Sequence, residues 1–235
     1  MGASRMNERL QELAAAYDVP PAAVDALRRI LELVASDDTA PTTVREPARA
    51  VDVHVADSLS GLELDAVRSA RTIADLGAGA GFPGLALAAA LPDAQVSLVE
   101  SVGRKCAFME RAIEASGLRN ASVVCRRAEE WEGGNDLVTA RALAPLAVIA
   151  EYAAPLLRVG GSLVAWKGAR DRDEETDAAV AAEELGLELV EVRRVSPFPG
   201  AEQRYLHLYS KASATPPRFP RRPGMARKHP LGRST

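Results

Sequence analysis

The chain has 235 residues, of which 47% are hydrophobic, 26% are charged and 4% are aromatic. This balance suits a packed, mostly aliphatic globular core and excludes wholesale disorder. No apolar run is long enough to span a bilayer, and the N-terminus lacks the apolar region of a signal peptide, so we expect a cytoplasmic protein without membrane partners.

Charge is distributed unevenly along the chain, although the net charge is only −3. Eight of the 29 lysines and arginines, and none of the 32 aspartates and glutamates, lie in residues 203–235. The rest of the chain therefore carries a net charge of −11. An acidic body with a basic end predicts that this end meets an anion, and the alternative is a solvated terminal segment.

Cysteine and histidine patterns argue against a metal site. Cys106 and Cys125 form neither a Cys-x-x-Cys pair nor a metal-ligand spacing, and no secretory signal accompanies them. We therefore expect two reduced, packed thiols. His54, His207 and His229 form no zinc motif, so no metal is expected.

Helical periodicity dominates residues 6–65, while residues 1–5 are assigned no structure. A Pro-Pro pair at 20–21 separates a first helix from a second, and a third is expected over residues 47–60. The apolar face of the first helix is formed by Leu10, Leu13, Ala14 and Tyr17. That of the second is formed by Val24, Leu27, Ile30, Leu31 and Val34. We treat residues 1–65 as a helical extension packed on the domain that follows.

From residue 71 the pattern changes to short apolar or β-branched runs with helical segments between most of them. Strands are predicted at 72–76, 95–99, 122–125, 136–140 and 162–166. Helices are predicted at 84–91, 103–116, 145–157 and 173–185. This alternation predicts an α/β Rossmann-like fold with a mostly parallel sheet and helices on both faces.

Two more alternating runs, 188–194 and 204–209, are expected to complete seven strands as a closing antiparallel pair. Residues 66–211 then form the core domain. Residues 212–235 are rich in Pro, Arg and Gly and are predicted to form an extended basic tail.

The most informative stretch is DLGAGAGFPG at residues 75–84, between a predicted strand and a predicted helix. Glycines let the backbone turn sharply and approach a ligand closely. Its last six residues also satisfy the GxGxxG spacing of dinucleotide-binding folds, a weak match by itself. The acidic residue two positions before the first of three alternating glycines resembles the first motif of S-adenosylmethionine-dependent methyltransferases. The residues concerned are Asp75, Gly77, Gly79 and Gly81.

Two later strand ends extend the expected cofactor site. Glu100 ends the second predicted strand, where a carboxylate accepts hydrogen bonds from both ribose hydroxyls of NAD or S-adenosylmethionine. Ala128 and Glu129 follow the third strand, at the corner that faces adenine in methyltransferase folds, and a simple helix cap is the alternative. We expect S-adenosylmethionine as the cofactor.

Further motifs accompany this loop in a defined order. They are DVHVADSL (52–59), ESVGRK (100–105), RAEE (127–130), TARA (139–142), WKG (166–168) and FPRRPG (219–224). Their order and spacing, over nearly the whole chain, resemble the ribosomal RNA small subunit methyltransferase G family, also called glucose-inhibited division protein B. The glycine motif alone is unspecific, whereas the combination is specific.

The resemblance implies a class I methyltransferase fold and methylation of N7 of guanine 527 in the 530 loop of 16S rRNA. It also implies cofactor contacts at the positions that match the family motifs, which are Gly77, Phe82, Ala128, Glu129 and Arg141. For Arg141 two roles stay open, namely pairing with the methionine carboxylate, which the resemblance favours, and gripping RNA phosphate. His54, Asp57 and Ser58 either shape the cofactor mouth or serve the fold.

Guanine N7 already carries an in-plane lone pair, so methyl transfer needs no general base and catalysis depends on positioning. No catalytic residue is therefore certain, and the candidates are Arg141 and Lys167, which follow the fourth and fifth strands. Phosphate contacts supply affinity with little sequence choice. Candidates for them are Arg104, Lys105, Arg126, Arg127, Lys167, Arg218, Arg221 and Arg222.

The expected partner is 16S rRNA or a 30S ribosomal particle, bound by a monomer. Selection of one guanine is expected to need RNA shape or flipping of the base out of its stack. Three alternatives remain: a small-molecule methyltransferase, an NAD-dependent oxidoreductase, and a non-catalytic RNA-binding module.

Overall fold

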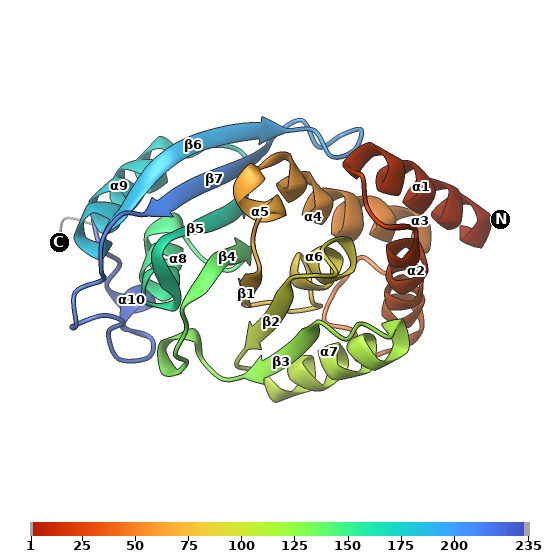
Figure 1. The fold of residues 1–235 in the computed structure, drawn as a ribbon, viewed down its shortest axis with the longest axis horizontal. Helices are drawn as coiled ribbons and strands as arrows, with labels where there is room; N and C mark the ends of the chain where they lie inside the picture. The colour runs from red at the N-terminus through yellow and green to blue at the C-terminus, as the bar shows by residue number, and fades with distance from the viewer. Residues whose placement is uncertain (1, 233–235) are drawn as a thin grey trace.

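The computed structural model describes residues 2–232 and places a seven-stranded sheet at the centre of the molecule (Figure 1). The strands are β1 (Thr72–Leu76), β2 (Gln95–Glu100), β3 (Ala121–Cys125), β4 (Asn135–Arg141), β5 (Leu157–Lys167), β6 (Leu187–Val195) and β7 (Arg204–Lys211). Their order is β3-β2-β1-β4-β5-β7-β6. Strand β7 is antiparallel to both neighbours, and the other pairs are parallel. The α/β fold and the closing antiparallel pair are confirmed.

Burial explains why the central strands could be predicted from the sequence. Four of the five residues of β1 are buried, and so are five of the seven in β4. A parallel strand covered on both faces needs apolar side chains at successive positions. Strand β5 begins at Leu157, five residues before its predicted start, and the pairing of this first part with β4 is irregular. There the backbone at Gly161 passes so close to neighbouring carbonyl oxygens that a Cβ would lie 2.9–3.0 Å from them.

Helices cover both faces of the sheet and form one apolar cluster with each. Helices α6 (Gly84–Ala90) and α7 (Gly103–Ser116) belong to the first cluster. Helices α8 (Leu146–Ala153) and α9 (Arg172–Leu185) belong to the second. Both α7 and α9 end at a left-handed glycine, which accepts this conformation without the Cβ penalty. The helices predicted over this region are confirmed.

The N-terminal extension packs on the first cluster. Helices α1 (Gly2–Tyr17) and α2 (Pro21–Ser36) lie at the end of the molecule opposite α9 (Figure 1). The expectation of no structure for residues 1–5 was wrong for residues 2–5, which form the first turn of α1, and Met1 lies outside the described residues. No helix within residues 2–232 has the length and apolarity needed to span a membrane.

The third predicted helix is confirmed as a continuous helical run with changing geometry. It comprises α3 (Pro47–Ala50), a π-helical turn (Val51–Ala56), α4 (Asp57–Leu59) and a 3₁₀ turn (Ser60–Glu63), and α5 (Asp65–Arg68) follows. Turns of π-helix are rare in proteins, and those that occur often lie at functional sites. This one carries His54 and leads directly into Asp57, and both side chains are buried.

The C-terminal segment differs from the extended tail expected from its composition. Up to residue 232 it folds back on α8 and includes the short helix α10 (Met225–Lys228) (Figure 1). Phe219 and Ala226 are 7% and 2% exposed and join the second apolar cluster. Arg221 pairs at 2.5 Å with Glu151, whose side chain is 2% exposed. One anion that the basic segment meets is therefore a carboxylate of the protein itself. Residues 233–235 lie outside the described part.

The expectation of two reduced, packed thiols was also wrong. Cys106 and Cys125 form a disulfide between α7 and β3, and only Cys106 is buried. Their separation of 19 positions hides this relation, because α7 folds back along β3 and brings the two Cα atoms to 5.8 Å. The disulfide therefore joins α7 to the edge strand directly before Arg126.

Candidate active site

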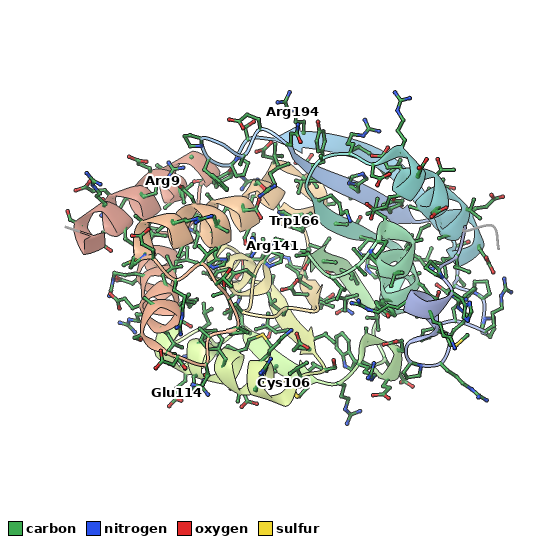
Figure 2. The ribbon with its side chains drawn as sticks, turned by 180° about the vertical axis from the view of Figure 1, so that it is seen from behind. Arg9, Cys106, Glu114, Arg141, Trp166 and Arg194 are labelled. Carbon is green, nitrogen blue, oxygen red and sulfur yellow. A yellow bond between two sulfur atoms is a disulfide. The ribbon has the colours of Figure 1, made fainter. Side chains whose placement is uncertain are left out.

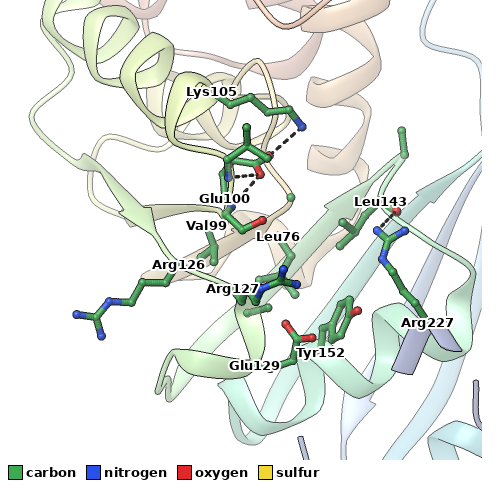
Figure 3. A pocket seen from close by; sticks show the side chains of 15 residues that line it. Leu76, Val99, Glu100, Lys105, Arg126, Arg127, Glu129, Leu143, Tyr152 and Arg227 are labelled. Carbon is green, nitrogen blue, oxygen red and sulfur yellow. Dashed lines mark hydrogen bonds and ion pairs between the residues drawn. The ribbon is translucent and has the colours of Figure 1, made fainter. Parts of the chain in front are cut away.

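The carboxyl ends of β1 to β4 border a cavity of about 370 Å³, which we call the strand-end cavity (Figure 3). Its lining residues are Leu76, Gly77, Val99, Glu100, Ser101, Val102, Lys105, Arg126, Arg127, Ala128, Glu129, Ala142, Leu143, Tyr152 and Arg227. Ligands of open α/β sheets bind at this edge. Four residues expected to bind the cofactor, Gly77, Glu100, Ala128 and Glu129, are therefore brought together.

Asp75 supports the glycine loop from within the protein. Its fully buried carboxylate accepts hydrogen bonds from the Gly84 backbone N–H and the Thr139 hydroxyl, each at 2.9 Å. Burial raises the pKa of Asp75 to about 6, although both hydrogen bonds oppose the shift. Gly77 has a left-handed φ of 64°, and a Cβ there would lie 2.4 Å from Leu143. These contacts fix a turn that only glycine accommodates.

Glu100 is held by the backbone that follows β2 (Figure 3). Its Oε1 accepts hydrogen bonds from the backbone N–H groups of Ser101 and Val102 at 2.8 and 3.0 Å. Its Oε2 lies 3.3 Å from Lys105 Nζ. The carboxylate is thus oriented at the cavity wall before any ligand arrives.

Tyr152 of α8 and Arg227 of α10 line the opposite side of the cavity, and sequence reasoning assigned neither to this site (Figure 3). Arg227 donates to the Leu143 carbonyl at 2.9 Å. The Glu129 carboxylate accepts the Gly224 N–H at 3.0 Å. The C-terminal segment therefore forms part of the cavity wall, and no periodicity in the sequence links it to the strand ends.

A second cavity of about 430 Å³ adjoins the first, and Ala142 lines both. This adjoining cavity is lined by Thr42, Val44, Val53, His54, Asp57, Arg141, Ala142, Trp166, Lys167, Gly168 and Arg204. Ala142 has a φ of 53°, which is uncommon for a residue other than glycine. The two catalytic candidates thus lie with His54 and Asp57, two of the three motif residues whose roles the sequence left open. The third, Ser58, is buried and donates to the His54 carbonyl within the helical run.

Arg141 ties the N-terminal helical run to the sheet, and it lies close to Trp166 in the interior (Figure 2). Its Nη1 donates to Asp57 Oδ2 at 2.7 Å and to the Val53 carbonyl at 3.0 Å. The Trp166 indole N–H donates to the Asp57 carbonyl at 2.9 Å. The Arg141 and Asp57 side chains are 16% and 9% exposed, so little water screens this ion pair.

Phe82 lines neither cavity, although the resemblance implied a cofactor contact there. Its ring stacks on His54, with centroids 4.9 Å apart and planes at 11°. Burial lowers the pKa of His54 to about 4, and the nearby charge of Arg141 adds to the shift. Gly79 and Gly81 also lie outside both linings and shape the loop through their left-handed φ values.

The eight candidates for phosphate contacts divide into two groups. Four are exposed and pair with no carboxylate within residues 2–232: Arg104, Arg126, Arg127 and Arg222. Four pair with carboxylates of the protein: Lys105 with Glu100, Lys167 with Glu174, Arg218 with Glu184, and Arg221 with Glu151. The exposed group is the better placed to meet an external anion.

Solved structures share the fold. A methyltransferase from Aquifex aeolicus described as SAM-dependent has a TM-score of 0.56 at 14% identity, over 69% of this chain and 93% of that one. Methanococcus jannaschii fibrillarin has a TM-score of 0.53 at 17% identity, over 67% and 74%. The chain therefore has the fold of a SAM-dependent methyltransferase.

The family model for rRNA small subunit methyltransferase G matches residues 28–201. Ribosomal RNA small subunit methyltransferase G of Rubrobacter xylanophilus is 41% identical over 196 residues, covering 80% of this chain and 75% of that protein. The enzyme of the same name from Symbiobacterium thermophilum is 37% identical over 228 residues, covering 91% and 92%. The chain belongs to the rRNA small subunit methyltransferase G family.

Proposed function

We propose that this protein transfers a methyl group from S-adenosylmethionine to N7 of guanine 527 in the 530 loop of 16S rRNA. The observation that carries the proposal is the strand-end cavity, in which the Gly77 turn and the oriented Glu100 carboxylate meet. A nucleoside fits such a site, because the turn admits a close approach and the carboxylate accepts from hydroxyls. Family membership supplies the rRNA substrate class.

Residues of the strand-end cavity, together with Arg141 of the adjoining cavity, support a role for each part of the cofactor. Glu100 binds the ribose hydroxyls, and Ala128 and Glu129 read the adenine edge. Arg141 uses Nη1 for Asp57 and Val53, and its guanidinium carries further donors with which it binds the methionine carboxylate. Phe82 acts indirectly, since it packs against His54 behind the loop.

The reaction needs alignment rather than proton removal. S-adenosylmethionine supplies an activated methyl group when it is bound. As the guanine N7 lone pair forms the new N–C bond, the C–S bond breaks and its electron pair goes to sulfur. The positive charge thus passes from sulfur to the purine. The protein's contribution is to hold N7 in line with the methyl group and to place negative charge near the purine.

The substrate is rRNA presented in a folded form. The protein outside residues 203–235 is acidic, which favours a target recognised by shape and by a few basic contacts over binding to any exposed RNA. We propose that a cytoplasmic monomer acts on 16S rRNA or on a 30S particle.

The test is transfer of a labelled methyl group to 16S rRNA and to 30S subunits that lack the modification. Borohydride and aniline cleavage then maps 7-methylguanine. One cleavage in the 530 loop is the expected result. Transfer to another position would contradict the proposed target, and absence of transfer to both forms would contradict the proposed activity.

A further inference from the structure

We propose that the adjoining cavity binds the target guanine, and that Asp57 selects it by accepting hydrogen bonds from its N1–H and N2–H₂ groups. This assignment rests on the proposed function. It concerns a cavity that the cofactor motifs reach only through Arg141, and it gives Asp57 the role of a specificity-determining residue.

Unpaired polar atoms concentrate at this cavity. Within residues 2–232, four buried side-chain nitrogen or oxygen atoms lack a hydrogen-bond partner. Two of them, Asp57 Oδ1 and His54 Nδ1, belong to residues that line the adjoining cavity. A buried polar atom without a partner is costly, so its persistence in a cavity wall points to a ligand that supplies the missing partner.

The rest of Asp57 is fixed in place. Oδ2 is held by Arg141 at 2.7 Å, and the backbone carbonyl is held by the Trp166 indole at 2.9 Å. Close packing reinforces this arrangement, because a Cβ on Gly61 would lie 2.4 Å from the Trp166 ring. The side chain therefore presents Oδ1 with a defined direction before the base enters.

Arg204 is the group that the base would displace. Its Nε forms an ion pair with Asp57 Oδ1 at 3.4 Å that lacks hydrogen-bond geometry, and its side chain is 40% exposed. Movement of this partly exposed side chain costs little packing. Once displaced from Oδ1, its guanidinium remains a donor at the cavity wall for the O6 carbonyl of guanine.

The chemistry of the four bases explains the selectivity. Guanine has two adjacent donors on its Watson–Crick edge, N1–H and N2–H₂, and an ionised carboxylate is a pure acceptor. Adenine has an acceptor at N1, which would face the carboxylate repulsively, and pyrimidines lack N7. Enzymes that modify bases read a flipped base by this edge. When Asp57 holds guanine by its Watson–Crick edge, the Hoogsteen edge, which carries N7, stays free for methyl transfer.

Position and charge agree with this assignment. Ala142 lines both cavities, so the adjoining cavity opens beside the site proposed for the cofactor. The product 7-methylguanine carries a positive charge, which the Asp57 carboxylate stabilises. His54 stays neutral near pH 7, because burial lowers its pKa to about 4, and it therefore adds no opposing charge.

The experiment uses 16S rRNA, free and reconstituted into 30S particles, with guanine or inosine at the target position. Inosine keeps N7, O6 and N1–H but lacks the N2 amino group. We measure kcat/KM for the wild-type protein, for Asp57→Asn and for Asp52→Asn. The last is a matched control, because Asp52 lies one helical turn earlier and pairs with Arg9 near the surface. Equilibrium dialysis of S-adenosylmethionine with each protein monitors the cofactor site.

For the wild-type protein and Asp52→Asn, we expect inosine to lower kcat/KM by on the order of tenfold, through the loss of one of two paired hydrogen bonds. Asp57→Asn should methylate guanine on the order of a hundredfold more slowly and should treat the two bases alike. The asparagine oxygen can still accept from Arg141, so cofactor affinity should fall far less than kcat/KM. Equal rates on guanine and inosine with the wild-type protein would overturn the assignment, whether or not the variant folds. Absence of transfer to guanine would instead contradict the proposed function itself.

Discussion

The strand-end cavity and the adjoining cavity lie side by side but are built from different parts of the chain. The first is formed largely by the ends of β1 to β4 and by the turns directly after them. The second gathers side chains from residues 42–57, 141–142, 166–168 and 204. Local turn chemistry therefore determines most of the first cavity, whereas the second exists only once distant segments have packed together.

The largest effect is expected at Gly77, where the strand-end cavity depends on one backbone turn. In Gly77→Asp the left-handed φ of 64° and the contact with Leu143 introduce strain, and a carboxylate enters the cavity. The Kd for S-adenosylmethionine, measured by equilibrium dialysis, should rise by on the order of a thousandfold.

The matched control is Gly117→Asp at the end of α7. Its φ is 73°, and nothing lies within 4 Å of a Cβ there. It should cost about 1 kcal/mol of stability and leave cofactor binding intact. Undiminished binding by Gly77→Asp would place the cofactor elsewhere and remove the distinction between the two cavities.

The C-terminal wall of the strand-end cavity offers the next largest effect. Arg221→Ala leaves Glu151 buried without its cation, so the free energy of unfolding should fall by about 3 kcal/mol in chemical denaturation. The adjacent Arg222→Ala, at an exposed position, should change it by less than about 0.5 kcal/mol. If Arg221→Ala lowered the free energy of unfolding as little as Arg222→Ala does, the Arg221–Glu151 pair would not stabilise the fold.

A pH-dependent effect is expected behind the glycine loop. The pKa of Asp75 is raised from 3.8 to about 6, so the folded protein binds a proton between these values that the unfolded chain has released. The stabilisation is complete below pH ~4 and is lost as the pH rises through ~6. From pH 4 to pH 7, the wild-type protein should lose about 2 kcal/mol more stability than Asp75→Asn.

The measurement for Asp75 is urea denaturation at each pH. Asparagine retains both contacts, since its oxygen accepts from Gly84 and its amide donates to Thr139. Asp93→Asn serves as the control, because that side chain is 84% exposed. Parallel stability curves for the wild-type protein and Asp75→Asn would contradict the raised pKa.

The smallest effect is expected at Glu100, which the backbone holds in place whether or not a ligand is bound. Glu100→Gln replaces a charged acceptor with a neutral one, so the Kd for S-adenosylmethionine should rise by about tenfold in calorimetry. Glu114→Gln, at an exposed position of α7, should leave it unchanged. An unchanged Kd for Glu100→Gln would remove the ribose role from this carboxylate.

The elements of the sheet could be predicted because each leaves a local signal. Ile73 to Leu76 form a buried run that is apolar except for Asp75, and Gly117 and Gly186 mark helix ends. The positions of Gly77 and Glu100 at the cavity follow from their places at the ends of consecutive parallel strands. Strand order then brings these ends together without any further information from side chains.

Contacts between distant residues could not be predicted in the same way. Arg141 meets Asp57 across 84 positions, and Arg227 reaches Leu143 across another 84. Neither contact leaves a periodic pattern, because each depends on how a helix or loop docks on the finished sheet. The Cys106–Cys125 disulfide was missed for the same reason, since spacing rules treat the chain as linear. Composition likewise predicted an extended basic tail and could not reveal its buried partner Glu151.

The assignment of the cofactor to the strand-end cavity and of the target guanine to the adjoining cavity is tested most directly by a crystal structure. The crystal would contain the protein, S-adenosylhomocysteine and the 530-loop RNA. We predict density for the adenosyl group in the strand-end cavity, with its ribose at Glu100 and its adenine beside Ala128. The target guanine should lie in the adjoining cavity, with its Watson–Crick edge on Asp57. Density for the adenosyl group in the adjoining cavity, or a target base held outside it, would contradict the account.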